Sequence, residues 1–360
     1  MKKYLWIVIV IIVIIVGIVV FSPKNTPVGE KQTVKIGLSL PLTGDLAFMG
    51  EGAKEATQLA IENFGPTKHN YEFIYEDDQF SGTKAVTTIN KLISIDKINA
   101  VVSAGSPAGN TIAPITEKNK IIHFGVASDQ NVAKGDYNFI HWTPPSEESK
   151  VLISELLKRN LKRVVLFEMN QPGVLAFTSD FKERIKGSGI EIVSIQGFNP
   201  GEKDFKSYIS KAKTSNGDIY LLEATSPEIE ILTQQVRDAG ITKPLTSVES
   251  FEFSSKPELF EGLWFVGPAA SSDSFNKMYN DKYGKNPPLG APNVYDIIGL
   301  IMTGAEKTDK ITPENLLTEV NKIKDYKGAL GVLNIDKDGL VISQAIIKMI
   351  KNGKPIISTN

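Results

Sequence analysis

The sequence VKIGLSLPLTGDLAFMGEGAKEATQLAIENF occupies residues 34–64 and contains one strand, one loop and one helix. The run 34–40 is mostly apolar, as is typical of a parallel strand covered on both faces. Small polar residues follow it, and residues 50–64 then have the spacing of an amphipathic helix. The apolar side of that predicted helix is formed by Ala53, Ala56, Ala60 and Ile61.

The same alternation of strand and helix continues along most of the chain. Further strands are predicted at 71–75, 100–103, 121–126, 164–167, 191–195, 219–222 and 263–266, and further helices at 84–95 and 228–239. Repeated strand–helix units predict an α/β fold with parallel sheets and right-handed crossovers. Eight or more units exceed one ordinary sheet, so we expect two doubly wound lobes. The tail 329–357 instead predicts strands joined by turns at 336–339 and 351–354.

The overall composition excludes several classes of protein. The chain has 360 residues, with 40 basic and 41 acidic side chains and a formal net charge of −1. It therefore has no basic excess to neutralise a phosphate backbone, and we expect no nucleic-acid partner. The sequence has no cysteine, which removes disulfides, thiolate nucleophiles, iron–sulfur clusters and a lipidated cysteine as a surface tether.

The first residues predict a membrane segment. Lys2 and Lys3 precede an uninterrupted apolar run from Tyr4 to Phe21, which is near the lower length limit for a spanning helix. The run is longer than the apolar core of a signal peptide, and no clear cleavage site follows it. We expect residues 1–25 to be an N-terminal transmembrane anchor and 26–32 a tether, with the remainder extracytoplasmic. The alternative is a cleaved signal peptide and a secreted protein.

The loops that follow the predicted strands are candidates for a binding site. Ligands of open parallel sheets bind beyond the carboxyl ends of the strands. Ser106 lies in one such loop where a helix begins, and the free N–H groups there attract anions such as a carboxylate. Glu249 ends an apolar segment, so its charge needs a partner such as a ligand ammonium group. The alternative is that these residues only cap helices and form turns.

The sequence offers little support for an enzyme. It has only three histidines, none of them in an H-E-x-x-H motif, and it lacks G-x-S-x-G and the phosphate-binding P-loop pattern. Spacing alone leaves a Ser-His-Asp triad open. We expect no catalysis, no metal ion and no cofactor.

Five short segments carry a resemblance to a known family through their order and spacing over more than 300 residues. They are Val34–Gly37 with Thr43–Gly44, Tyr75–Asp78, Gly201–Phe205, Gly217–Tyr220 and Tyr295–Asp296. From about Val34 onward the chain resembles type I periplasmic binding proteins, in the leucine/isoleucine/valine-binding branch of ABC-transporter receptors. The resemblance implies two lobes joined by three crossovers, with a ligand cleft between them. Lobe one would comprise 33–145 plus 272–326, and lobe two 146–271 plus 327–360.

The resemblance also implies which residues bind the ligand. Ser106 takes the place of the serine that binds the ligand carboxylate, Ala127 offers a carbonyl, and Glu249 pairs with the ammonium group. Asp129 stands where the family has threonine. The aromatic residue of the first loop corresponds to Phe48 or Met49. Two tyrosines are replaced, one by the segment that ends in Gly173 and one by Thr225, so leucine, isoleucine and valine are not simply implied as ligands.

We therefore expect an extracytoplasmic solute-binding protein that delivers an amino acid, branched-chain or otherwise apolar, to an ABC permease in the membrane. One alternative is a ligand-sensing ectodomain. Another keeps the fold and changes the ligand to an amide, a urea or an aromatic acid.

Overall fold

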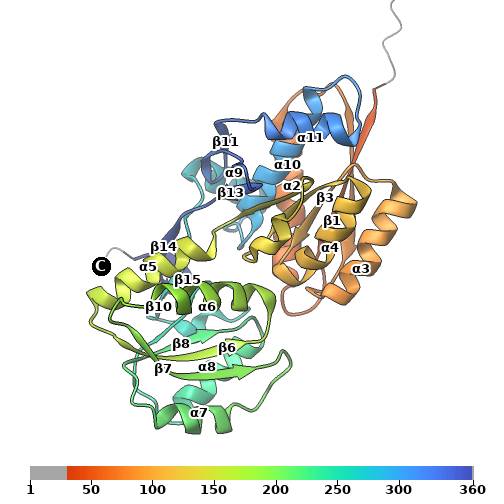
Figure 1. Cartoon of the computed structure of the whole chain (residues 1–360). Coiled ribbons are helices and arrows are strands. Elements are labelled where there is room, and N and C mark those ends of the chain that lie inside the picture. Colours follow the sequence, from red (N-terminus) through yellow and green to blue (C-terminus); the bar gives the residue numbers. More distant parts are fainter. Residues whose placement is uncertain (1–30, 359–360) are drawn as a thin grey trace, which may run out of the picture. The chain divides into compact units, whose positions relative to one another are not determined.

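The computed structural model describes residues 31–358, and a six-stranded parallel sheet organises its first part (Figure 1). The strand order is β13-β5-β4-β3-β1-β2, and every neighbouring pair is parallel. The central strands are buried throughout because helices cover both faces. The strands are β1 (Thr33–Leu40), β2 (Asn70–Asp77), β3 (Ala100–Ala104), β4 (Ile122–Val126), β5 (Asn138–Trp142) and β13 (Leu340–Ile342).

Different helices cover the two faces of this sheet. The core on one face includes α2 (Ala47–Phe64), α9 (Asp273–Tyr283), α10 (Ala291–Glu306) and α11 (Pro313–Asn321). The core on the other face includes α3 (Gly82–Lys91) and α4 (Ser106–Asn119). The Ser81 side chain accepts a hydrogen bond from the backbone of Lys84 and so caps α3. A π-helical turn (Leu92–Asp96) follows α3, and a 3₁₀ turn (Gln130–Ala133) follows β4.

A second parallel sheet has four strands in the order β7-β6-β8-β9. Its side chains alternate between two cores, since Val165 and Phe167 lie in one and Val164 and Leu166 in the other. The strands are β6 (Arg163–Met169), β7 (Glu191–Phe198), β8 (Ile219–Glu223) and β9 (Leu245–Thr246). The helices are α5 (Pro145–Lys158) and α6 (Pro172–Arg184) in one core, and α7 (Lys206–Lys213) and α8 (Glu228–Asp238) in the other.

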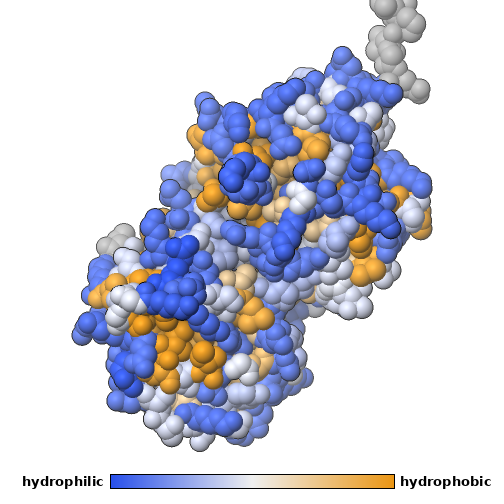
Figure 2. All heavy atoms as spheres, in the orientation of Figure 1, coloured by the Kyte–Doolittle hydropathy of each residue, from blue (hydrophilic) through white to orange (hydrophobic). Residues whose placement is uncertain are grey.

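The remaining strands are antiparallel. β10 (Trp264–Pro268) pairs with β14 (Ala345–Lys351), which pairs with β15 (Lys354–Ile357) across a turn at Asn352 and Gly353. β11 (Tyr326–Gly328) and β12 (Gly331–Leu333) form a hairpin, and a 3₁₀ turn (Pro257–Phe260) precedes β10. Figure 2 shows that hydrophilic side chains cover most of the visible face, as expected when the apolar side chains fill the cores.

The α/β fold with parallel sheets that the sequence predicts is confirmed. The expected anchor (1–25) and almost all of the tether (26–32) lie outside the described residues. Within 31–358, none of the helices has both the length and the apolar character that crossing a bilayer requires.

Two elements differ from the sequence-based expectation. The strand expected at 263–266 pairs antiparallel with β14, and it meets the segment after β9 only through a single parallel bridge between Val266 and Val248. Residues 327–342, expected in the second lobe, pack with the first sheet, because β13 pairs with β5 and Val341 lies in that core. A three-residue strand carries no signal for the sheet that it joins, so the pattern could not settle this assignment.

Asp296 holds the hairpin segment to α10. Its fully buried carboxylate accepts hydrogen bonds from the backbone N–H groups of Ala329 and Leu330 and lies 3.3 Å from His141 Nε2. These contacts supply the partners that a buried carboxylate requires. Asp296 thus joins three segments that are far apart in the sequence.

Candidate functional site

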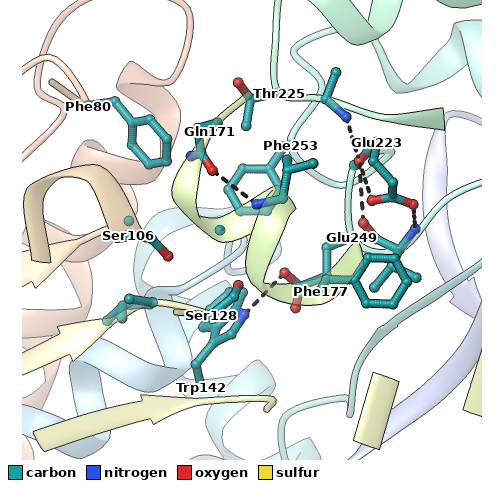
Figure 3. A pocket seen from close by; sticks show the side chains of 18 of the residues that line it. Phe80, Ser106, Ser128, Trp142, Gln171, Phe177, Glu223, Thr225, Glu249 and Phe253 are labelled. Carbon is teal, nitrogen blue, oxygen red and sulfur yellow. Dashed lines mark hydrogen bonds between the residues drawn. The ribbon is translucent and has the colours of Figure 1, made fainter. Parts of the chain in front are cut away.

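One cavity lies at the carboxyl ends of strands from both parallel sheets, as the general rule for open α/β folds predicts (Figure 3). Its free volume is about 50 Å³. The residues of the first sheet and its helices that line it are Met49, Phe80, Gly105, Ser106, Val126, Ala127, Ser128 and Trp142. The remaining residues that line the cavity are Glu148, Gln171, Gly173, Val174, Phe177, Glu223, Ala224, Thr225, Val248, Glu249, Ser250 and Phe253.

Ser106 is the first residue of α4 and reaches the cavity from the end of β3. Gly105 precedes it with a φ of +85°, and a Cβ atom at that position would overlap the ring of Phe80. The backbone N–H of Asp129 donates to Ser106 Oγ at 3.1 Å, which leaves the hydroxyl proton for another acceptor. The residue therefore offers a hydroxyl donor beside the N-terminus of a fourteen-residue helix.

Glu249 enters the cavity from the segment after β9. It is 5% exposed and has a φ of +59°, an uncommon conformation for a residue other than glycine. Its backbone N–H donates to the Val266 carbonyl at 2.7 Å, which holds the residue in this conformation. Trp142 Nε1 donates to Glu249 Oε2 at 3.1 Å, and Figure 3 shows the carboxylate turned toward the indole. A strained backbone that aims a buried carboxylate into a cavity is typical of a functional residue.

Two further glutamates line the same cavity. Glu148 lies in the first turn of α5 and is 1% exposed. Burial raises its pKa well above the usual range, and the charge of Glu249 and a hydrogen bond to it raise the pKa further. Glu148 therefore keeps its proton at a pH where an exposed glutamate has lost it, and it hydrogen-bonds with Glu249. Glu223, at the end of β8, accepts hydrogen bonds from Val248 N–H at 2.7 Å and from Ser250 Oγ at 3.3 Å.

Burial also raises the pKa of Glu249, to about 7, while the hydrogen bonds with Glu148 and Trp142 oppose the rise. The charge of Glu252 raises this pKa and that of Lys348 lowers it, and these two residues form a nearly buried ion pair. Burial likewise raises the pKa of Glu223 well above its usual range. The site therefore holds protons at a pH where exposed glutamates have lost them.

We expect this raised pKa to be visible in the pH dependence of stability. A carboxyl group with a raised folded-state pKa stabilises the ligand-free protein fully below about pH 4.5, and the contribution is lost as pH rises through about 7. Relative to Glu249→Gln, which cannot ionise, the wild type should lose on the order of 3 kcal/mol of unfolding free energy over this range. Urea unfolding of both proteins at pH 4.5 to 8 measures the difference. Parallel curves would contradict the assignment.

Six of the eight residues proposed from the sequence line this cavity: Met49, Ser106, Ala127, Gly173, Thr225 and Glu249. Asp129 and Phe48 do not. The Asp129 carboxylate accepts from Asn110 Nδ2 at 2.7 Å and from the backbone of Asn131, so it caps the 3₁₀ turn and its neighbour Ser128 lines the cavity. Phe48 borders a different hollow, because consecutive helical residues point about 100° apart and Met49 takes the inward position.

Sequence reasoning missed most of the aromatic wall and two of the three carboxyl groups. Phe80, Phe177 and Phe253 line the cavity, and Trp142 contributes both a ring and a donor. Phe251, by contrast, is fully buried against Phe260 and does not line the cavity. Among the described residues, no cluster of three or more His, Asp or Glu side chains is arranged to hold a metal ion.

Comparisons with known proteins place this geometry in context. A family model described as periplasmic binding protein matches residues 33–354. The leucine-, isoleucine-, valine-, threonine- and alanine-binding protein of Pseudomonas aeruginosa is 25% identical over 330 residues, which cover 86% of this chain and 87% of that protein. The leucine-binding protein LivK of Thermotoga maritima has a TM-score of 0.82 at 25% identity, covering 91% of this chain and 98% of that one.

A third similar protein was solved with a different kind of ligand. It is a solute-binding protein of an ABC transporter from Rhodopseudomonas palustris, in complex with 3,4-dihydroxybenzoic acid. Its TM-score is 0.78 at 20% identity, and the match covers 90% of this chain and 95% of that one. At this identity the likeness concerns the fold alone.

Proposed function

Because the chain belongs to the periplasmic binding protein family, in its leucine/isoleucine/valine-binding group, and is a solute-binding protein of the ABC-transporter type, we propose that its cavity binds an amino acid. The observation that carries this proposal is the meeting of Ser106 and Glu249 in one cavity. One offers a hydroxyl donor beside a helix N-terminus, and the other offers a buried carboxylate. A zwitterion requires that pair of partners.

In the proposed complex, the ligand carboxylate accepts from Ser106 Oγ and from N–H groups at the start of α4. The ammonium group donates to Glu249. The two residues follow strands of different sheets, so one ligand contacts both parts of the protein at once. Such a ligand stabilises whichever arrangement brings the two sets of loops together, which is the basis of a binding protein that closes around its solute.

The walls of the cavity favour a compact ligand. Met49, Phe177 and Phe253 supply apolar surface around the carboxyl groups. An aromatic acid is disfavoured, because it has no ammonium group to offer the buried Glu249.

A thermal-shift panel of amino acids and aromatic acids tests this proposal on the full chain. At 100 times its dissociation constant, a ligand of the folded state adds about 2.7 kcal/mol of unfolding free energy, which raises the melting temperature clearly. We expect at least one amino acid to do so, and its deaminated counterpart and benzoate to have no effect. Stabilisation by benzoate and by no amino acid would contradict the proposal.

The further parts of the proposal concern partners and location. We propose that the protein delivers its ligand to an ABC permease, that residues 1–25 anchor it in the membrane, and that 26–32 form the tether. We also propose two lobes centred on the two parallel sheets. The first comprises 33–145 plus 272–342 and the second 146–271 plus 343–360, because the pairing of β13 with β5 supports moving the last boundary from 326 to 342.

A further inference from the structure

The charge of the cavity lining is unbalanced. Three glutamates line it, and none of the described residues that line it is lysine, arginine or histidine. A neutral amino acid brings one positive and one negative charge, so its binding leaves this imbalance unchanged. A buried carboxylate is costly without a counter-charge or a proton, and the ligand-free site meets that cost by holding protons.

The three carboxyl groups are not equivalent. Both oxygens of Glu223 already accept hydrogen bonds from Val248 and Ser250. By contrast, no N–H or hydroxyl donor of the described residues reaches Glu148 Oε1 or Glu249 Oε1, although both side chains are more than nine-tenths buried. The two carboxyl groups hydrogen-bond to each other, and Trp142 donates to the other oxygen of Glu249. Two carboxyl groups of the cavity lining therefore keep an unused acceptor atom, whereas a single α-ammonium group neutralises the charge of only one carboxylate.

We propose that the ligand of this cavity carries a second cationic nitrogen on its side chain and that Glu148 binds it. This inference rests on the proposed amino-acid function, in which Glu249 already takes the α-ammonium group. The ligand is then an amino acid with a short side chain that ends in an amine. On binding, Glu148 releases its proton to solvent and its carboxylate pairs with the side-chain cation. The charge of the ligand replaces the proton of the ligand-free pair.

Matched pairs of ligands test the inference by calorimetry on the full chain. The pairs are 2,4-diaminobutyrate with 2-aminobutyrate and ornithine with norvaline. We expect the cationic member of at least one pair to bind at least about tenfold more tightly. Repeating the titration in buffers of different ionisation enthalpy should show about one more proton released by that member.

Variants separate the role of Glu148 from general damage to the site. Glu148→Gln, which keeps the shape of the side chain, should reduce the preference for the cationic member to about twofold or less and abolish the extra proton release. Glu147→Gln is the matched control, since Glu147 lies in the same helical turn and does not line the cavity. A melting curve checks that each variant is folded. A preference that survives Glu148→Gln unchanged would overturn the inference.

The outcomes distinguish the inference from the proposed function. If the neutral members of the pairs bind as tightly as the cationic ones, the amino-acid proposal stands. The proposal of a second cationic nitrogen on the ligand is then wrong. If no member of any pair binds but another amino acid of the thermal-shift panel does, the amino-acid proposal stands and this inference is wrong; if no amino acid binds at all, both fail.

Discussion

Replacing Glu249 by alanine should weaken amino-acid binding by at least about 30-fold, the largest effect that we expect from any single change in the cavity. Removing one partner of a buried, hydrogen-bonded charge pair costs about 2–5 kcal/mol, because the other charge stays buried and unpaired. Here the group left unpaired is the ligand ammonium. The loss should appear mainly as faster dissociation, and calorimetry with stopped-flow kinetics measures both quantities.

Two further variants make this prediction specific. Glu249→Gln keeps the acceptor for Trp142 and removes only the charge, so it should retain part of the lost affinity. Glu258→Ala removes an exposed carboxylate from the same part of the chain and should leave affinity unchanged. Binding by Glu249→Ala at wild-type affinity would remove the basis of the proposed ammonium site.

Asp296→Ala should destabilise the folded protein by on the order of 3 kcal/mol without a change at the cavity. The substitution leaves the buried N–H groups of Ala329 and Leu330 without their acceptor and removes the partner of His141. Because these groups join α10, β5 and the hairpin, the first sheet should lose more stability than the second. Urea unfolding with hydrogen exchange resolved by segment measures this difference.

An exposed aspartate provides the control. Asp309 pairs with Lys68 at the surface, and Asp309→Ala should change the unfolding free energy by less than about 1 kcal/mol, as is usual for exposed ion pairs. Equal effects of the two substitutions would show that the buried hydrogen bonds of Asp296 contribute little.

The sequence predicted the positions that follow from strand–helix alternation. Ser106, Ala127 and Glu249 each lie within three residues of the end of a strand, and parallel strands bring their carboxyl ends to one edge. Glu148 could not be predicted in this way. An acidic residue in the first turn of a helix is ordinary, since it interacts favourably with the helix dipole, and only the chain crossing from β5 to α5 buries this one.

Other differences between the sequence-based expectation and the structure arise from offsets of a single residue and from short elements. Asp129 and Ser128 are adjacent, and the capping of the 3₁₀ turn decides which one lines the cavity. β5 was not predicted, because Asn138 and His141 interrupt its apolar pattern. Both residues are buried and satisfied by partners distant in sequence, such as Thr116 for Asn138. No local pattern reveals such partners.

The pairing of β13 with β5 has a consequence for the order in which the protein can fold during synthesis. All four strands of the second sheet lie between residues 163 and 246, whereas the edge strand of the first sheet ends at residue 342. At 5–20 residues per second, a ribosome takes roughly 5–20 s to add the intervening segment. Throughout that interval the outer edge of β5 lacks its neighbour, so the nascent chain has an open parallel edge to which another chain could pair.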